Sequence, residues 1–257
     1  MQKQRVQELA SQFYSGLVAE LYDFLAAELP RADDYIPFLD RSGTPALELA
    51  CGSGLPMLDL LERGYEVEGL DASSDMLDRC RGRAAARGLN PTLYLAEMQS
   101  FQLPRRYRSI FLAGASFTLL TTDEDASKAL ARIYGHLETG GYARIPLEIE
   151  DSQAIRKDLG CYREITNRSG DRLRMSTLAL DASEDGRNLS HRHRYERIPA
   201  AGEPVVVERT WERRWWTQKQ FRELLFAAQF DEVAFVTPAG GVAEPDTSVF
   251  VALARRI

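Results

Sequence analysis

Short apolar runs alternate with amphipathic stretches between residues 45 and 150. Runs of strand length cover residues 46–50, 65–71, 92–97, 109–114 and 142–149. Apolar residues at helical spacing occupy the intervals 56–64, 73–88 and 123–141, and a glycine ends each of them. Strands that alternate with helices in this way predict a mainly parallel sheet with helices on both faces.

The pattern differs on either side of this region. Residues 4–29 and 32–41 carry helical spacing, and Pro30 separates the two pieces. Beyond residue 150, four segments of alternating side-chain type are separated by turn compositions, which predicts antiparallel strands over 161–168, 171–182, 188–198 and 204–215. A helix over 217–229, with Thr217 as N-cap, and strands over 230–238 and 247–257 complete the chain.

Composition limits the class of protein. The chain has 257 residues, 44% of them hydrophobic and 27% charged, which is typical of a folded globular protein. A net charge of −6 disfavours nucleic acid as a partner. We see no secretory signal, and the longest apolar run, 110–120, is too short to span a membrane. Three widely spaced cysteines favour the reducing cytoplasm over a disulfide framework.

The most informative motif is the glycine loop in LELACGSGLP, residues 47–56. Gly52 and Gly54 match the first two glycines of the dinucleotide fingerprint, but Met57 occupies the third position. No lysine follows as in a Walker loop, and Glu48 would repel a pyrophosphate. A ligand with a cationic head and no phosphate fits these features better, and S-adenosylmethionine (SAM) is such a ligand.

The region 45–150 resembles the class I SAM-dependent methyltransferases. Their first motif places an acid before a glycine-rich loop, and Glu48, Ala50, Gly52 and Gly54 stand at those positions. The resemblance implies that further cofactor contacts come from residues at the ends of the next strands, namely Asp71 on the ribose, Ala72, Met76 on the adenine, Glu97, Met98 and Ala113. Two residues depart from the family pattern, since Glu97 and Ser109 stand where relatives often have Asp.

This resemblance defines the expected fold and domain organisation. We expect an α/β, Rossmann-like, seven-stranded, mostly parallel sheet with an N-terminal helical cap and an antiparallel β insertion. One methyltransferase domain would then span 1–257, with the cap at 1–44, the SAM-binding core at 45–150, the insertion at 151–213 and the end of the core at 214–257. The cap also resembles that of nucleotide-sugar N-methyltransferases, in which a tyrosine closes over SAM, and Tyr14, Tyr22 and Tyr35 are the candidates.

The implied reaction transfers a methyl group from SAM to a nitrogen or oxygen of a small molecule and leaves S-adenosylhomocysteine (SAH). The motif of enzymes that methylate flipped adenine is absent, because AGASF follows the fourth strand. In-line displacement needs mainly positioning, and a base only for oxygen, carbon or a protonated amine. His191 and His193 share one face of an insertion strand and Glu148 ends the fifth strand, so these three are candidate catalytic residues.

Several alternatives remain open from the sequence alone. The two histidines are also compatible with a structural role, as are His136, Trp215 and Trp216. A SAM-binding protein without methyl transfer, such as a cyclase or a binding module, is the rival function, and Met57 disfavours a dehydrogenase. We expect no metal, because ligand-spaced clusters are missing, although Glu148, Glu150 and Asp151 would be the carboxylates to recruit magnesium. We expect no membrane association, and a monomer or homodimer.

Overall fold

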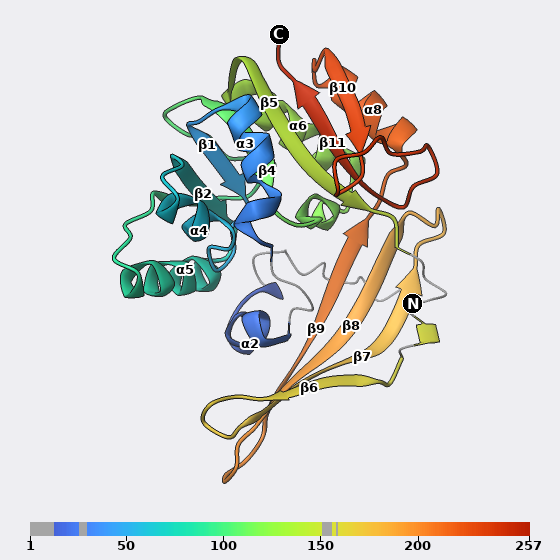
Figure 1. Ribbon diagram of the computed structural model, residues 1–257. Helices are drawn as coiled ribbons and strands as arrows, with labels where there is room; N and C mark the ends of the chain where they lie inside the picture. The colour runs from blue at the N-terminus through green and yellow to red at the C-terminus, as the bar shows by residue number, and fades with distance from the viewer. Residues whose placement is uncertain (1–12, 26–29, 151–155, 158) are drawn as a thin grey trace.

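The computed structural model describes residues 13–25, 30–150, 156–157 and 159–257 (Figure 1). Its main sheet has seven strands in the order β10-β11-β5-β4-β1-β2-β3. The parallel strands are β1 (Ala46–Leu49), β2 (Val67–Asp71), β3 (Leu93–Leu95), β4 (Tyr107–Leu112) and β5 (Leu137–Glu148). β11 (Val249–Arg255) is antiparallel to both β5 and β10 (Glu232–Val236). The predicted seven-stranded, mostly parallel sheet is confirmed.

Helices cover both faces of this sheet, as the alternation predicts. On one face, α6 (Asp123–His136) and α8 (Gln218–Ala227) bury residues such as Ile133 and Phe221 in the larger core. On the other face lie η1 (Ala32–Asp34), α3 (Ile36–Ser42), α4 (Met57–Glu62) and α5 (Ser74–Ala86). The fully buried strands therefore read as continuous apolar runs, because neither face meets water.

Polar side chains define where the longer helices begin. The hydroxyls of Ser73, Thr122 and Thr217 accept hydrogen bonds from backbone N–H groups in the first turns of α5, α6 and α8. Gln220 completes a capping box at α8, which confirms Thr217 as its N-cap.

One predicted boundary is wrong. The helix predicted over 123–141 ends at His136, and the next residue already belongs to β5. Gly140 and Gly141 lie in an irregular part of β5, where Tyr107 pairs with Leu137 but Ser109 pairs with Tyr142. These two glycines therefore lie in a β-bulge and do not end the preceding helix.

The insertion forms a separate antiparallel sheet of order β6-β7-β8-β9, as predicted. Its strands are β6 (Tyr162–Thr166), β7 (Arg172–Ala182), β8 (Asn188–Ile198) and β9 (Val205–Arg214). Helix α2 (Leu17–Leu25) packs against this sheet, with Val18 and Leu21 next to Leu173 and Tyr195 (Figure 1). The segment predicted as a helix over 4–29 is described only in part, because 1–12 and 26–29 lie outside the described residues.

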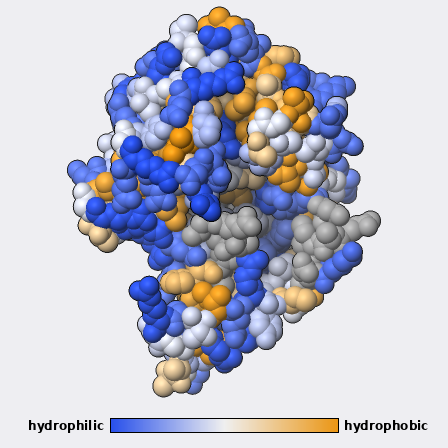
Figure 2. All heavy atoms as spheres, viewed as in Figure 1, coloured by the Kyte–Doolittle hydropathy of each residue, from blue (hydrophilic) through white to orange (hydrophobic). Residues whose placement is uncertain are grey.

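Hydrophilic side chains predominate on the face shown in Figure 2. Among the described helices, none has the length and apolar character that crossing a bilayer requires.

Candidate active site

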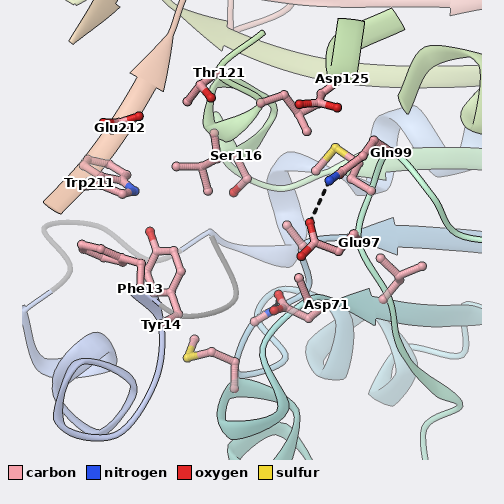
Figure 3. Close-up of a pocket in the computed structure, with 18 of the residues that line it drawn as sticks. Phe13, Tyr14, Asp71, Glu97, Gln99, Ser116, Thr121, Asp125, Trp211 and Glu212 are labelled. Carbon is pink, nitrogen blue, oxygen red and sulfur yellow. Dashed lines mark hydrogen bonds between the residues drawn. The ribbon is translucent and has the colours of Figure 1, made fainter. Parts of the chain in front are cut away.

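A pocket lies where the carboxyl ends of β1, β2 and β3 face the insertion (Figure 3). The short helix η2 (Ser116–Leu119) and edge strand β9 form its opposite wall. Nine of the predicted cofactor residues line it, namely Tyr14, Tyr22, Ala50, Gly52, Asp71, Ala72, Met76, Glu97 and Met98. The ends of parallel strands are where open α/β sheets place ligands, which accounts for this location.

The carboxylate of Asp71 is held in place at the end of β2 by backbone donors. The N–H of Gly52 donates to Oδ2 and the N–H of Ser73 donates to Oδ1, each at 2.8 Å. Burial raises the pKa of Asp71, and these backbone bonds act in the opposite direction. Each oxygen keeps capacity for a further donor, so the group can accept from two adjacent hydroxyls.

The two loop glycines have different roles. Gly52 lines the pocket with φ +52°, and a Cβ there would lie 3.3 Å from Cε of Met76, so a side chain would narrow the site. Gly54 does not line the pocket. A Cβ on Gly54 would come within 2.7 Å of Sγ of Cys80, so this glycine allows α5 to pack against the loop.

The N-terminal segment covers the pocket through two tyrosines. The rings of Tyr14 and Tyr22 meet edge to face at 5.6 Å, and burial raises the pKa of both phenols, which keeps them protonated. The backbone carbonyl of Tyr14 accepts from Oγ of Ser73 at 2.5 Å. This bond ties the segment to the loop that follows β2.

Helix α2 is anchored to the core by one acid. Asp23 accepts hydrogen bonds from Ser53, Arg79 and Arg83, each at 2.7 Å. Burial alone would raise the pKa of Asp23, but its hydrogen bonds with Arg79 and Ser53 and the charge of Arg83 outweigh burial and lower it. The segment that carries Tyr14 and Tyr22 is therefore anchored at Tyr14 by Ser73 and, just after Tyr22, by Asp23.

The far wall consists of residues that the sequence analysis did not single out. Trp211 of β9 stacks on Phe13 with ring centroids 6.0 Å apart. Polar residues of β9, η2 and the segment after η2 also line the pocket, namely Ser116, Thr121, Asp125, Thr210 and Glu212. Strand alternation predicts that Trp211 lies on one face of β9. Only the packing of the insertion against the core shows that this edge strand borders the pocket.

The candidate catalytic residues His191, His193 and Glu148 do not line the pocket. Oε2 of Glu150 lies 2.9 Å from Nε2 of His191, and Arg213 binds Glu150 and, at 3.2 Å, Glu148. Burial opposes ionisation of Glu150, but the hydrogen bond to His191 and the charge of Arg213 lower its pKa. The geometry therefore places the histidines, Glu150 and Arg213 in a buried joint between β5 and the insertion, with Glu148 partly exposed at its edge, and gives no support for direct contact with a substrate.

His193 occupies the same joint. Its ring stacks on His191 at 5.6 Å, and its Nδ1 lies 3.2 Å from the hydroxyl of Thr177. Burial lowers the pKa of His193 to about 4, so the ring is neutral at physiological pH. Trp211 lies against both histidines, at 5.8 and 6.2 Å, and connects the joint with the pocket wall.

Comparison with known proteins fits this geometry. Residues 46–141 match the family model described as a methyltransferase domain. Residues 46–141 form a methyltransferase domain. This domain contains the loop, Asp71 and the three residues predicted to contact the adenine, Met76, Glu97 and Met98.

Two curated relatives are N-methyltransferases by name. The dTDP-3-amino-3,4,6-trideoxy-alpha-D-glucopyranose N,N-dimethyltransferase of Streptomyces venezuelae is 32% identical over 133 residues, which are 48% of this chain and 54% of that protein. A glycine/sarcosine N-methyltransferase of Halorhodospira halochloris is 30% identical over 125 residues, 48% of this chain and 47% of the relative. The chain thus spans about half the length of the curated relatives it matches.

Solved structures extend the likeness to the whole fold. The sugar N-methyltransferase KedS8 from Streptoalloteichus sp ATCC 53650 superposes with a TM-score of 0.67 at 19% identity, covering 100% of this chain and 96% of that one. A SAM-dependent methyltransferase from Clostridium acetobutylicum ATCC 824 has a TM-score of 0.69 at 16% identity, so the described residues share the fold of both solved structures.

The residues of the methyltransferase domain fit SAM. Asp71 offers free acceptor capacity for ribose hydroxyls, and Gly52 leaves room beside Met76. Glu97 lines the pocket with one oxygen accepting from Nε2 of Gln99 at 2.8 Å (Figure 3). These residues would hold the ribose and the adenine.

Glu48 behaves differently from what the resemblance implies. Its side chain is fully buried beneath the loop, outside the pocket wall, and its oxygens have no hydrogen-bond partner in the described part of the chain. Burial and the charge of Asp71 raise the pKa of Glu48 well above its usual range. The position of Glu48 beneath the loop therefore gives no support for direct contact with the cationic end of SAM.

The remaining candidates lie away from the pocket wall. Tyr35 is buried against Phe111, and its hydroxyl donates to the carbonyl of Ala113, so neither Tyr35 nor Ala113 is on the wall. Ser109 is fully buried near the amino end of β4, where it donates to the carbonyl of Gly43 at 2.6 Å. Its departure from the family pattern therefore does not concern the cofactor.

Other predicted groups have structural partners. Trp216 is buried and donates to Asp123 at 2.7 Å, which supports its reading as a core residue, while Trp215 is half-buried and also off the wall. His136 accepts from the N–H of Leu103 at 3.0 Å. In the described residues no three His, Cys, Asp or Glu side chains gather as a metal site requires, and Asp151 lies outside the described part.

Proposed function

We propose that this protein transfers a methyl group from SAM to an amine nitrogen of a small molecule. One observation carries the proposal: a single pocket combines the cofactor residues of a methyltransferase domain with a second, polar and aromatic wall supplied by β9. The named relatives add support, because those proteins methylate an amino sugar and glycine on nitrogen.

The chain's residues supply position and shielding. SAM brings an activated methyl group when it is bound. The amine lone pair forms the new N–C bond while the C–S bond breaks, its electron pair stays on sulfur, and the methylated nitrogen releases a proton to water. Tyr14, Tyr22 and Trp211 exclude water around the reacting atoms, and holding the amine in line accounts for most of the acceleration.

The proposed division of labour follows the fold. Residues 45–150 bind SAM, residues 214–257 complete the core sheet, and the cap 1–44 together with the insertion 151–213 encloses the acceptor in a single domain spanning 1–257. The protein acts as a monomer or homodimer in the cytoplasm. Three free cysteines, two of them buried, fit a reducing compartment.

The test measures methyl transfer directly. The purified protein is incubated with SAM and a panel of small amines, and the amounts of SAH and of methylated amine are measured by mass spectrometry. SAH formed in step with a methylated amine supports the proposal. Tight binding of SAM without SAH from any amine, or a product formed without methyl transfer, would instead favour the cyclase or binding-module alternative.

A further inference from the structure

The pocket carries negative charge and, among the described residues that line it, no positive charge. Its lining includes the carboxylates of Asp125 and Glu212, and none of the described lining residues is Lys, Arg or His. Asp71 and Glu97 face the proposed cofactor, Asp125 lies on their side of the pocket near Gln99, and Glu212 lies across the pocket on β9 (Figure 3).

Glu212 is available to bind a ligand. It is half-buried on β9, opposite Asp125 of α6 (Figure 3), and it has no ion-pair or hydrogen-bond partner for its carboxylate among the described residues. Arg213 follows it in sequence but is already bound to Glu148, Glu150 and Thr118. The guanidinium nearest in sequence therefore does not neutralise it.

Asp125 is held in place but only weakly compensated. The hydroxyl of Thr122 donates to its carboxylate at 2.9 Å, and Nζ of Lys128 stays 3.9 Å away while binding Glu124 at 2.7 Å. The side chain of Asp125 is 38% exposed, so it can reach a ligand without losing this support.

The aromatic groups on the side of Glu212 point to the same ligand chemistry. Phe13, Tyr14 and Trp211 line the pocket beside Glu212 (Figure 3). Aromatic faces attract cations, and low-dielectric walls strengthen the attraction of a carboxylate for an ammonium. The same arrangement repels a phosphate or carboxylate on the acceptor.

We propose that the acceptor is an amine that carries no phosphate or carboxylate and binds as its ammonium ion to Glu212, with Asp125 adding negative charge across the pocket. The ammonium ion loses one proton to water before its lone pair attacks the methyl group. This inference rests on the proposed function. The proposed acceptor differs in charge from those in the names of the relatives, because a dTDP-linked amino sugar and glycine both carry anionic groups. An amino sugar without a nucleotide is an acceptor of the proposed class.

Three acceptors that differ in anionic charge test it. They are the methyl glycoside of a 3-amino-3-deoxyhexose, glycine, and the same aminohexose linked to dTDP. We expect the wild-type protein to have a kcat/KM for the glycoside at least tenfold above the values for the two anionic acceptors. Glu212→Gln and Asp125→Asn should each lower kcat/KM for the glycoside about tenfold and leave the Kd for SAH unchanged.

Glu208→Gln is the matched control, because Glu208 lies on the same strand outside the pocket and pairs with Arg194 at the surface. It should change neither value. A preference for the dTDP-linked amine or glycine, or full activity of both pocket variants on the glycoside, would overturn the inference and leave methyl transfer standing. Absence of SAH with every amine, despite bound SAM, would overturn the proposed function as well.

Discussion

Replacing Asp71 by alanine should weaken the binding of SAM and SAH by ~2–3 kcal/mol. Two charge-assisted hydrogen bonds to the ribose would be lost, each worth about 1.5–3 kcal/mol. We expect a loss smaller than the sum of these two free energies, because burial raises the pKa of Asp71 and ionising the buried carboxyl costs free energy. A loss of ~2–3 kcal/mol corresponds to a Kd about 30- to 150-fold higher.

The loss has a second source in the loop. The N–H groups of Gly52 and Ser73 would lose the acceptor that fixes them at 2.8 Å, so the loop would be less well ordered before the ligand arrives. Asp71→Asn separates the two effects. It keeps one acceptor oxygen of the same size, so its affinity should fall between those of the wild type and Asp71→Ala.

Titration calorimetry with SAH measures the change, and thermal unfolding checks that each variant is folded. Asp78→Ala is a suitable control, because Asp78 lies on exposed α5 surface and pairs only with Arg81 among the ion pairs described. An Asp71→Ala variant that is folded and binds SAH with wild-type affinity would refute the assignment of the ribose to this carboxylate.

Three further outcomes follow from the site. Trp211→Leu should lower kcat/KM for the acceptor at least tenfold while the Kd for SAH stays the same, and an equal loss in both would show that Trp211 serves the cofactor instead. The pKa of His193 is lowered to about 4 in the folded protein, against 6.5 in the unfolded chain, so the unfolded state binds more protons between these pH values. The free energy of unfolding should therefore fall as pH drops from about 6.5 towards 4, and urea unfolding should show a smaller fall for His193→Gln. Activity should be equal in EDTA and in added magnesium, and loss in EDTA with recovery in magnesium would mean that Glu148 and Glu150 bind metal despite their bonds to Arg213.

The fold was accessible from the sequence because its signals are local. Apolar runs of strand length, glycines after helices and the hydroxyls of Ser73 and Thr217 each report on a few neighbouring residues. The order of these elements restricts a parallel sheet to few topologies. The exception at Gly140 and Gly141 has a non-local cause, since the bulge depends on pairing with β4.

The site was predictable only on its cofactor side. Asp71 and Gly52 come directly after strands, so their place follows from chain order. The acceptor side depends on how the insertion packs on the core, which no local pattern records. Thus the sequence directed attention to His191 and Trp216, while β9 brings Trp211 and Glu212 to the pocket instead.

The placement of charge at the two ends of the pocket has a consequence for the proposed reaction. During transfer, positive charge leaves the sulfur and develops on the nitrogen of the acceptor. The acceptor loses its ammonium proton before transfer, so the attacking nitrogen is neutral and regains positive charge as the N–C bond forms. Glu212 lines the pocket on the acceptor wall, so its attraction for the nitrogen grows from the neutral amine to the transition state. Binding groups that gain strength along the reaction lower its barrier, whereas equal attraction before and during transfer would not. The carboxylate of Glu212 would therefore contribute to rate as well as to selection of the amine.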